Sequence, residues 1–202
     1  VGLLRSANAQ VNRAEALASL REAMARKNRL PPREQLYLDA WNAQLTAPAD
    51  ALDKWRQMSE LYPDFFPAYA NVGYGLLSAR RYADAMDYAM RATDPQSEFA
   101  ALSMALVGQL HLGLENPGKA AEAFAAAQEG GVRNAPVGRA IALAARREFD
   151  RAHEVWSRQP TQDVAYFDHA SILLDQGDWN GAIEEMRRQL AATDAGSVRN
   201  QI

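Results

Sequence analysis

The sequence predicts an all-α protein built as an array of helical hairpins, and two observations carry that prediction. The first is composition: apolar residues make up 48% of the 202 residues and charged residues 23%, with alanine and leucine abundant and valine and isoleucine scarce. Good helix formers are therefore plentiful and good strand formers are few. The second is a helical sequence pattern that returns along the chain at intervals of 30 to 35 residues.

A small residue in the middle of an amphipathic helix marks each repeat. In DQGDWNGAIEEMRRQL (175–190), Ala182 stands where a helix normally buries a large side chain, and a turn precedes the helix. Five further segments place an alanine at the same position, and we call the set the anchor alanines: Ala16, Ala51, Ala85, Ala120, Ala152 and Ala182. Their spacings are 35, 34, 35, 32 and 30 residues.

A second small residue precedes most anchor alanines by eleven or twelve positions, in a helical pattern of its own. These residues are Ala40, Gly73, Gly108, Ala140 and Ala170. Each repeat is therefore predicted to contain a helix A, a short turn and a helix B, because small residues let two antiparallel helices approach to about 8–10 Å. A single hairpin cannot bury its own apolar face, whereas stacked hairpins can, and such stacking forms a solenoid.

This unit resembles the tetratricopeptide repeat family over nearly the whole chain. The resemblance rests on the small residue of helix A, an aromatic residue in the turn, the anchor alanine, and a bulky residue four positions later, such as Trp55, Phe124 or Trp156. It implies a single right-handed α-α superhelix over 1–202, with approximate units 1–31 (truncated), 32–65, 66–97, 98–131, 132–161 and 162–196. The sequence departs from the family in the short turn of the second unit and in the last two spacings.

A second resemblance concerns LPPREQLYLDAW (30–41) and LYPDFFPAYANVGY (61–74). These segments are similar to the C-terminal repeat region of bacterial cyclase-like signalling proteins of putative peptide-modification systems. The similarity implies that the chain is the scaffold or sensory part of a larger bacterial protein. Val1 is not a natural start, which also predicts a longer parent chain. We expect a cytoplasmic location, with the periplasm as the alternative.

Composition and motifs argue against several classes of function. The net charge of −3 is too small to predict a nucleic-acid partner. The longest uncharged apolar stretch, 99–114, contains polar residues and is interpreted as a helix buried on most sides rather than a membrane insertion. Cysteine is absent, and neither an H-E-x-x-H zinc helix nor a G-x-S-x-G elbow occurs. We therefore predict no enzyme activity, no catalytic residue, no cofactor and no metal.

The histidines leave one alternative to this prediction. His111 falls on the packing side of a very apolar helical pattern, which is typical of a hydrogen-bonded histidine in the core or in the groove. His169 lies in sequence near Asp163, Asp168 and Asp175. That group is either an acid–base or metal site, or a solvated acidic face beside an interior histidine, and we favour the second interpretation.

The resemblance to tetratricopeptide repeats places ligand contacts on helix A, one position after and three positions before its small residue. The positions are Tyr37, Trp41, Ala70, Tyr74, Ala105, Gln109, Val137, Ile141, Phe167 and Ser171, and Asn71 matches a residue that holds ligand backbone in related grooves. The predicted binding groove comprises Tyr37, Trp41, Asn71, Tyr74, Gln109, Ile141 and Phe167. The alternative is that the aromatic side chains pack against neighbouring helices.

Three functions follow from these patterns. The first is a protein–protein interaction module that binds a peptide or protein segment in the concave groove. The second is a spacer or dimerisation scaffold, either a homodimer or an array packed on an adjacent domain of the parent chain. The third is a helical small-ligand sensor that uses His111 or His169.

Overall fold

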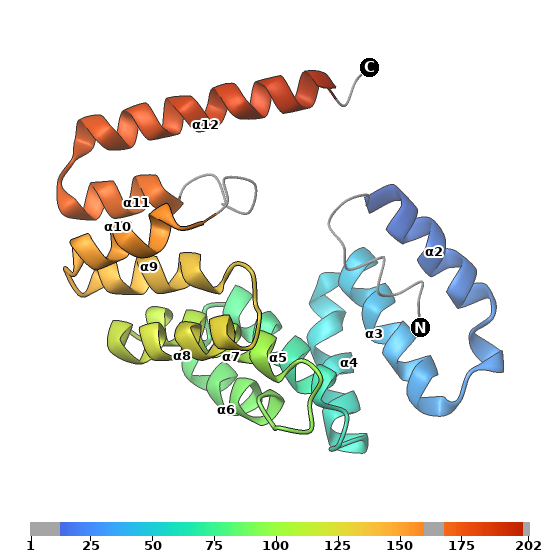
Figure 1. The fold of residues 1–202 in the computed structure, drawn as a ribbon. Coiled ribbons are helices and arrows are strands. Elements are labelled where there is room, and N and C mark those ends of the chain that lie inside the picture. The colour runs from blue at the N-terminus through green and yellow to red at the C-terminus, as the bar shows by residue number, and fades with distance from the viewer. Residues whose placement is uncertain (1–12, 160–167, 200–202) are drawn as a thin grey trace. The chain divides into compact units, whose positions relative to one another are not determined.

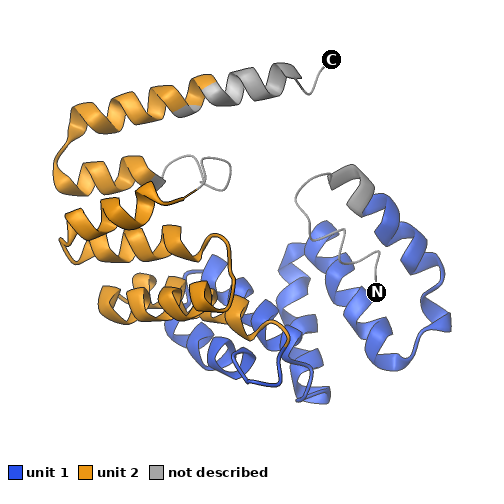
Figure 2. Ribbon diagram, in the orientation of Figure 1, with its two compact units in different colours: residues 1–97 blue, residues 98–202 orange. Residues whose placement is uncertain are grey.

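A computed structural model describes residues 13–159 and 168–199 of the chain (Figure 1). Within these ranges the chain forms eleven α-helices and one 3-10 helix, and no strand. Consecutive helices pack in pairs, so the predicted all-α fold of helical hairpins is confirmed. The chain divides into two compact units, residues 1–97 (unit 1) and 98–202 (unit 2), and each unit is described by itself (Figure 2).

Unit 1 contains two complete hairpins and the helices that precede them. Its elements are α2 (Arg13–Ala25), the 3-10 helix η1 (Lys27–Arg29), α3 (Pro32–Thr46), α4 (Pro48–Leu61), α5 (Phe66–Ser78) and α6 (Tyr82–Ala92). Helices α3 and α4 form one hairpin, α5 and α6 form the next, and α4 also packs on α5. Proline stands at the first or second position of α3, α4 and α5, where its missing N–H breaks no intrahelical hydrogen bond.

Unit 2 contains three hairpins stacked in chain order. Its helices are α7 (Ala100–Gly113), α8 (Pro117–Glu129), α9 (Ala135–Ala145), α10 (Phe149–Ser157), α11 (Asp168–Gln176) and α12 (Trp179–Arg199). Helix α8 packs on α9, and α11 packs on both α9 and α10. The apolar stretch 99–114 becomes α7, which is buried over much of its length as predicted. None of the described helices is both long enough and apolar enough to cross a lipid bilayer.

The predicted small residues lie at buried positions. Five of the six anchor alanines have described side chains, and these are at most 6% exposed: Ala51, Ala85, Ala120, Ala152 and Ala182. Their helix A counterparts are buried as well, namely Ala40, Gly73, Gly108, Ala140 and Ala170. The side chain of Ala16 lies outside the described residues. The handedness of the array and the predicted boundaries between repeats stay predictions, because they depend on both units together.

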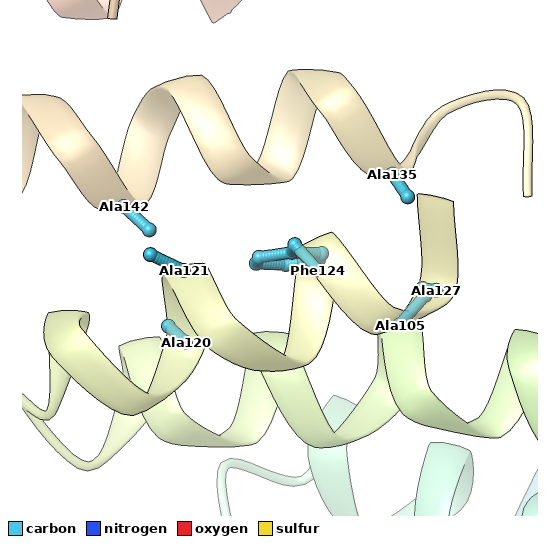
Figure 3. Packing of buried hydrophobic residues seen from close by; sticks show 7 residues of the cluster. All are labelled: Ala105, Ala120, Ala121, Phe124, Ala127, Ala135 and Ala142. Atoms are coloured by element: carbon cyan, nitrogen blue, oxygen red, sulfur yellow. The ribbon is translucent and has the colours of Figure 1, made fainter. Parts of the chain in front are cut away.

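Phe124 of α8 shows why small residues are needed at these positions. Its side chain is 3% exposed and points from α8 toward α9, with Ala121 facing Ala142 beside it (Figure 3). A Cβ added to Gly108 of α7 would lie 2.9 Å from ring atoms of Phe124, and one added to Gly138 of α9 would lie 2.4 Å from the ring. Both glycines therefore leave room for one aromatic ring in the core of unit 2.

The turns inside four hairpins share a feature that the repeat pattern did not predict. Each has a residue in the left-handed conformation five positions before the anchor alanine: Arg80 (φ 56°), Glu115 (φ 58°), Arg147 (φ 64°) and Gly177 (φ 92°). This conformation costs roughly 1–2 kcal/mol for a residue with a Cβ. Of the four residues, Gly177 alone signals it by residue type, so sequence reasoning missed the shared geometry of the other three turns.

Candidate functional site

An aromatic cluster in unit 1 holds two of the predicted groove residues. Tyr37 and Trp41 of α3 both pack edge-on against Trp55 of α4, each with ring centroids 5.6 Å apart. Tyr37 also lies 5.5 Å from the ring of Phe65, the residue immediately before α5, and the guanidinium of Arg33 stands 5.3 Å above that ring. These side chains join α3, α4 and the start of α5, so Tyr37 and Trp41 take part in helix packing.

Trp41 and Trp55 differ in how their indole N–H groups are satisfied. Trp55 Nε1 donates a 2.8 Å hydrogen bond to Oε1 of Gln44. Trp41 is 7% exposed, and its Nε1 is buried with no hydrogen-bond partner among the described residues. A substitution of Trp41 would therefore disturb the core of unit 1, and Trp41 is a poor probe of ligand binding. Direct contact of Trp41 with a ligand stays a prediction.

Asn71 and Tyr74 lie on one face of α5 and are both half-buried. Asn71 Nδ2 donates a 2.8 Å hydrogen bond to the carbonyl oxygen of Pro67 one turn earlier, which orients the side-chain amide along its own helix. Burial raises the pKa of the Tyr74 hydroxyl above its usual value, so this group stays protonated and can donate a hydrogen bond throughout the neutral range.

The predicted groove residues of unit 2 include no aromatic side chain among those that the structure describes. Gln109 of α7 and Ile141 of α9 are half-buried, whereas the neighbouring predictions Ala105 and Val137 are buried in the core. Phe167 lies outside the described residues. The structure thus places Tyr37, Trp41, Asn71 and Tyr74 in unit 1 and Gln109 and Ile141 in unit 2, and their assignment as a single groove stays a prediction.

A polar cluster joins the last helices of unit 2, and sequence reasoning did not predict it. His169 Nε2 of α11 lies 3.4 Å from Nδ1 of His153 of α10, whose Nε2 lies 2.7 Å from Oε1 of Gln176. The other ring nitrogen of His169, Nδ1, lies 3.8 Å from a carboxylate oxygen of Glu185 on α12. Trp156 stacks on the His169 ring, with centroids 5.0 Å apart.

This cluster agrees with the interior-histidine interpretation of His169. Within the described ranges, no three side chains of histidine, cysteine, aspartate or glutamate are grouped so that they could hold a metal ion. The side chains of Asp163 and Asp168 lie outside the described residues. The His153–His169 pair joins α10 to α11, and Glu185 extends the cluster to α12. The 16 residues between the two histidines explain why no local motif revealed the pair.

Two histidines of unit 2 are held in environments that disfavour their charged forms. Burial lowers the pKa of His169 below its usual value of 6.5, with the Glu185 carboxylate opposing that effect. Burial also lowers the pKa of His111, and the Lys119 ammonium acts in the same direction. Nδ1 of His111 is buried and has no hydrogen-bond partner among the described residues. Both imidazoles thus favour the neutral form in the folded chain.

We expect the chain to lose stability as the pH falls through about 6.5. In the unfolded chain His111 and His169 take up protons near that pH, whereas their lowered pKa values delay protonation in the folded chain. The unfolded state then binds more protons, so the free energy of unfolding falls until the pH drops below the folded pKa values. Urea midpoints measured at several pH values test this, and His111→Gln/His169→Gln should flatten the profile. An unchanged profile in that variant would refute the assignment.

Comparisons with known proteins support the fold and no more. No protein-family model matches the chain, and no curated protein matches it. Among solved structures, the chain is similar to "MamA RS-1 ArsTM double mutant", with a TM-score of 0.57 and 21% sequence identity. The similarity covers 77% of this chain and 89% of that chain. Together with the all-helical structure, it is consistent with a tetratricopeptide-like fold of helical hairpins.

Proposed function

We propose that the chain is a non-enzymatic protein–protein interaction module, a divergent tetratricopeptide repeat protein that binds an extended peptide segment on the helix A face of unit 1. The observation that carries the proposal is the partly exposed face of α5. Val72, Gly73 and Leu76 of this helix are buried, whereas Asn71 and Tyr74 remain half-buried at neighbouring turns. An amide and a tyrosine are thus presented side by side on one helix.

These two side chains suit an extended peptide chemically. The backbone of an extended peptide offers N–H donors and carbonyl acceptors, and the Oδ1 atom of Asn71 can accept from such an N–H while Nδ2 keeps its bond to Pro67. The Tyr74 ring provides apolar contact area and its hydroxyl a polar tip, a combination that is common among residues with large contributions to binding. Tyr37 of α3, which is also half-buried, is proposed as a further aromatic contact on helix A of the preceding hairpin.

The other residues of the predicted groove are proposed either to support the residues that contact the peptide or to make additional contacts with it. Trp41 supports Tyr37 from within the aromatic cluster, with ring centroids 6.3 Å apart. Gln109, Ile141 and Phe167 are proposed as contacts at corresponding helix A positions of unit 2. A bacterial signalling parent chain is also proposed, on the strength of the similarities at 30–41 and 61–74. A cytoplasmic location is proposed beside it, with the periplasm as the alternative.

A random peptide library tests the proposal, because selection from it requires no identified partner. Random dodecapeptides displayed on phage would be panned against the wild-type chain, after depletion on the Tyr74→Ala variant. We expect enriched peptides whose affinity falls by about tenfold or more in Tyr74→Ala, which corresponds to roughly 1.4 kcal/mol and is typical of a buried aromatic contact. Titration calorimetry on purified chains provides the affinities.

Tyr82→Ala is the matched control, because Tyr82 is also half-buried in unit 1 but begins α6, a helix B. Its affinity for the enriched peptides should remain within about twofold of wild type, since surface positions away from the contact change binding little. Equal losses in Tyr74→Ala and Tyr82→Ala, or no enriched peptide after depletion, would contradict binding at this face.

A further inference from the structure

In unit 2, helix α9 packs on a face of α8 that can be located by counting from the anchor alanine of α8. Ala121 and Phe124 stand one and four positions after Ala120. Ala121 shares a core cluster with Ala142 of α9, and the ring of Phe124 lies against Gly138 of the same helix (Figure 3). These two positions of helix B thus pack on the helix A that follows, and we call them the stacking positions.

Both stacking positions of α10 and the first one of α4 also face the helix A that follows. In α10 the positions hold His153 and Trp156, and both rings contact His169 of α11, with centroids 5.5 and 5.0 Å away. In unit 1 the first stacking position of α4 holds Leu52, and a Cβ added to Gly75 of α5 would lie 3.2 Å from its Cδ1 atom. At these three positions the following helix A presents a glycine or a histidine ring, whereas Trp55, at the second stacking position of α4, packs on Tyr37 and Trp41 of the preceding α3.

Helix α12 carries large apolar residues at the same positions, and they remain partly or fully exposed. Its stacking positions hold Ile183, which is 42% exposed, and the half-buried Met186. Trp179 is 67% exposed and Leu190 is 64% exposed. The four residues follow the spacing i, i+4, i+7 and i+11, so they form one apolar stripe along the helix. Residues at the stacking positions of α8 are by contrast at most 8% exposed.

The length of α12 bears on what can cover this stripe. Within the described ranges α11 is the helix that packs on α12, and it lies on the side of Ala182 rather than over the stripe. Helix α8 ends at Glu129, nine residues after its anchor alanine, and a short turn then brings α9 back over it. Helix α12 continues to Arg199, seventeen residues after its anchor. A helix joined to α12 by a similar short turn would begin opposite Arg199, and a helix of 11 residues such as α9 would be too short to run back over the stripe as far as Trp179.

We propose that the stripe Trp179–Ile183–Met186–Leu190 on α12 is a second interaction surface, which binds an amphipathic helix from another protein. The bound helix takes the place that α9 has on α8. It carries glycine or alanine where it crosses Ile183 and Met186, because these side chains need the space that Gly138 leaves for Phe124. An acidic residue on the bound helix would face Arg187, which is exposed beside the stripe. This surface goes beyond the peptide-binding face of unit 1.

The chain contains a natural probe for this surface, namely its own α9. A copy of residues 132–147 would be attached after Ile202 through a Gly/Ser linker of about 12 residues, which reaches roughly 20 Å and holds the helix at millimolar effective concentration. Emission of Trp179 is isolated by subtracting the spectrum of the Trp179→Phe chain. We expect the acrylamide quenching constant of Trp179 to fall by about half or more in the tethered chain, because docking covers the indole.

Two matched variants separate docking from a nonspecific effect of the tether. Gly138→Leu in the appended copy alone should restore quenching, since a large side chain prevents close approach, and Ile183→Asp in α12 should restore it with unchanged helicity by circular dichroism. Quenching that is the same with and without the tether would overturn the proposal. Protection of Trp179 in the untethered chain that rises with concentration, together with a doubled mass in sedimentation equilibrium, would also overturn it, because the occupant would then be a second copy of the chain.

Discussion

Trp55→Ala is expected to lower the free energy of unfolding by about 3–5 kcal/mol, the usual cost of truncating a fully buried large aromatic residue. Trp55 is 1% exposed and is the residue against which both Tyr37 and Trp41 pack. The variant would leave a cavity between α3 and α4 and would also remove the N–H donor that Gln44 accepts from. Urea denaturation followed by circular dichroism gives the change in stability.

Trp179→Ala is the control for this experiment, because it removes the same side chain from a position that is 67% exposed. We expect its effect to lie within about 0.5 kcal/mol of wild type. A similar loss in both variants would mean that the aromatic cluster of unit 1 does not carry the stability expected of it. A loss confined to Trp55→Ala would support the cluster as the core of this unit.

Phe124→Ala is the second substitution with a large expected effect, again about 3–5 kcal/mol. The ring fills the space between Gly108 of α7 and Gly138 of α9, so its removal leaves three helices around a void. Gly138→Ala alone should cost about 1–3 kcal/mol, because the new methyl group would overlap the ring and force a shift in a packed core. Thermal or urea denaturation of each chain measures both effects.

The double variant Phe124→Ala/Gly138→Ala tests whether the Phe124 ring is the reason that position 138 requires a glycine. Once Phe124 is alanine, the methyl group at position 138 has room, and alanine favours a helix over glycine by roughly 0.5–1 kcal/mol. Gly138→Ala should therefore be neutral or stabilising in the Phe124→Ala background. Additive losses in the double-mutant cycle would show that the glycine is not required by the ring.

The helices and their pairing could be predicted from sequence because they depend on local spacing. The anchor alanines recur with the length of a hairpin, and an alanine at the middle of an amphipathic helix predicts a close crossing wherever it occurs. The burial of Ala85, Ala120 and Ala152 confirms this reasoning. The left-handed conformations of Arg80 and Glu115 were not predicted from the sequence, because arginine and glutamate have no local preference for that conformation.

The candidate site was harder to predict, because register assigns a residue to a face but does not say what covers that face. Trp41 and Tyr74 occupy equivalent positions on their helices, yet Trp41 is 7% exposed and packs on Trp55, whereas Tyr74 remains half-buried. The difference arises from the other helix of the same hairpin, since α4 presents Trp55 beside Trp41, whereas α6 carries Ala89 at the position equivalent to Trp55. Ligand contact at either residue is decided by experiments on binding.

The sequence by itself determined that this chain is all-α, that its helices pair as hairpins, and which small residues lie at the crossings, because periodicity and side-chain volume act over one or two helices. The tertiary structure alone decided that Gly138 accommodates Phe124, that His153 meets His169, and that Trp179 and Ile183 of α12 are exposed. Each of these depends on the distance and angle between helices that are separated in sequence, and spacing within a helix carries no information about either quantity.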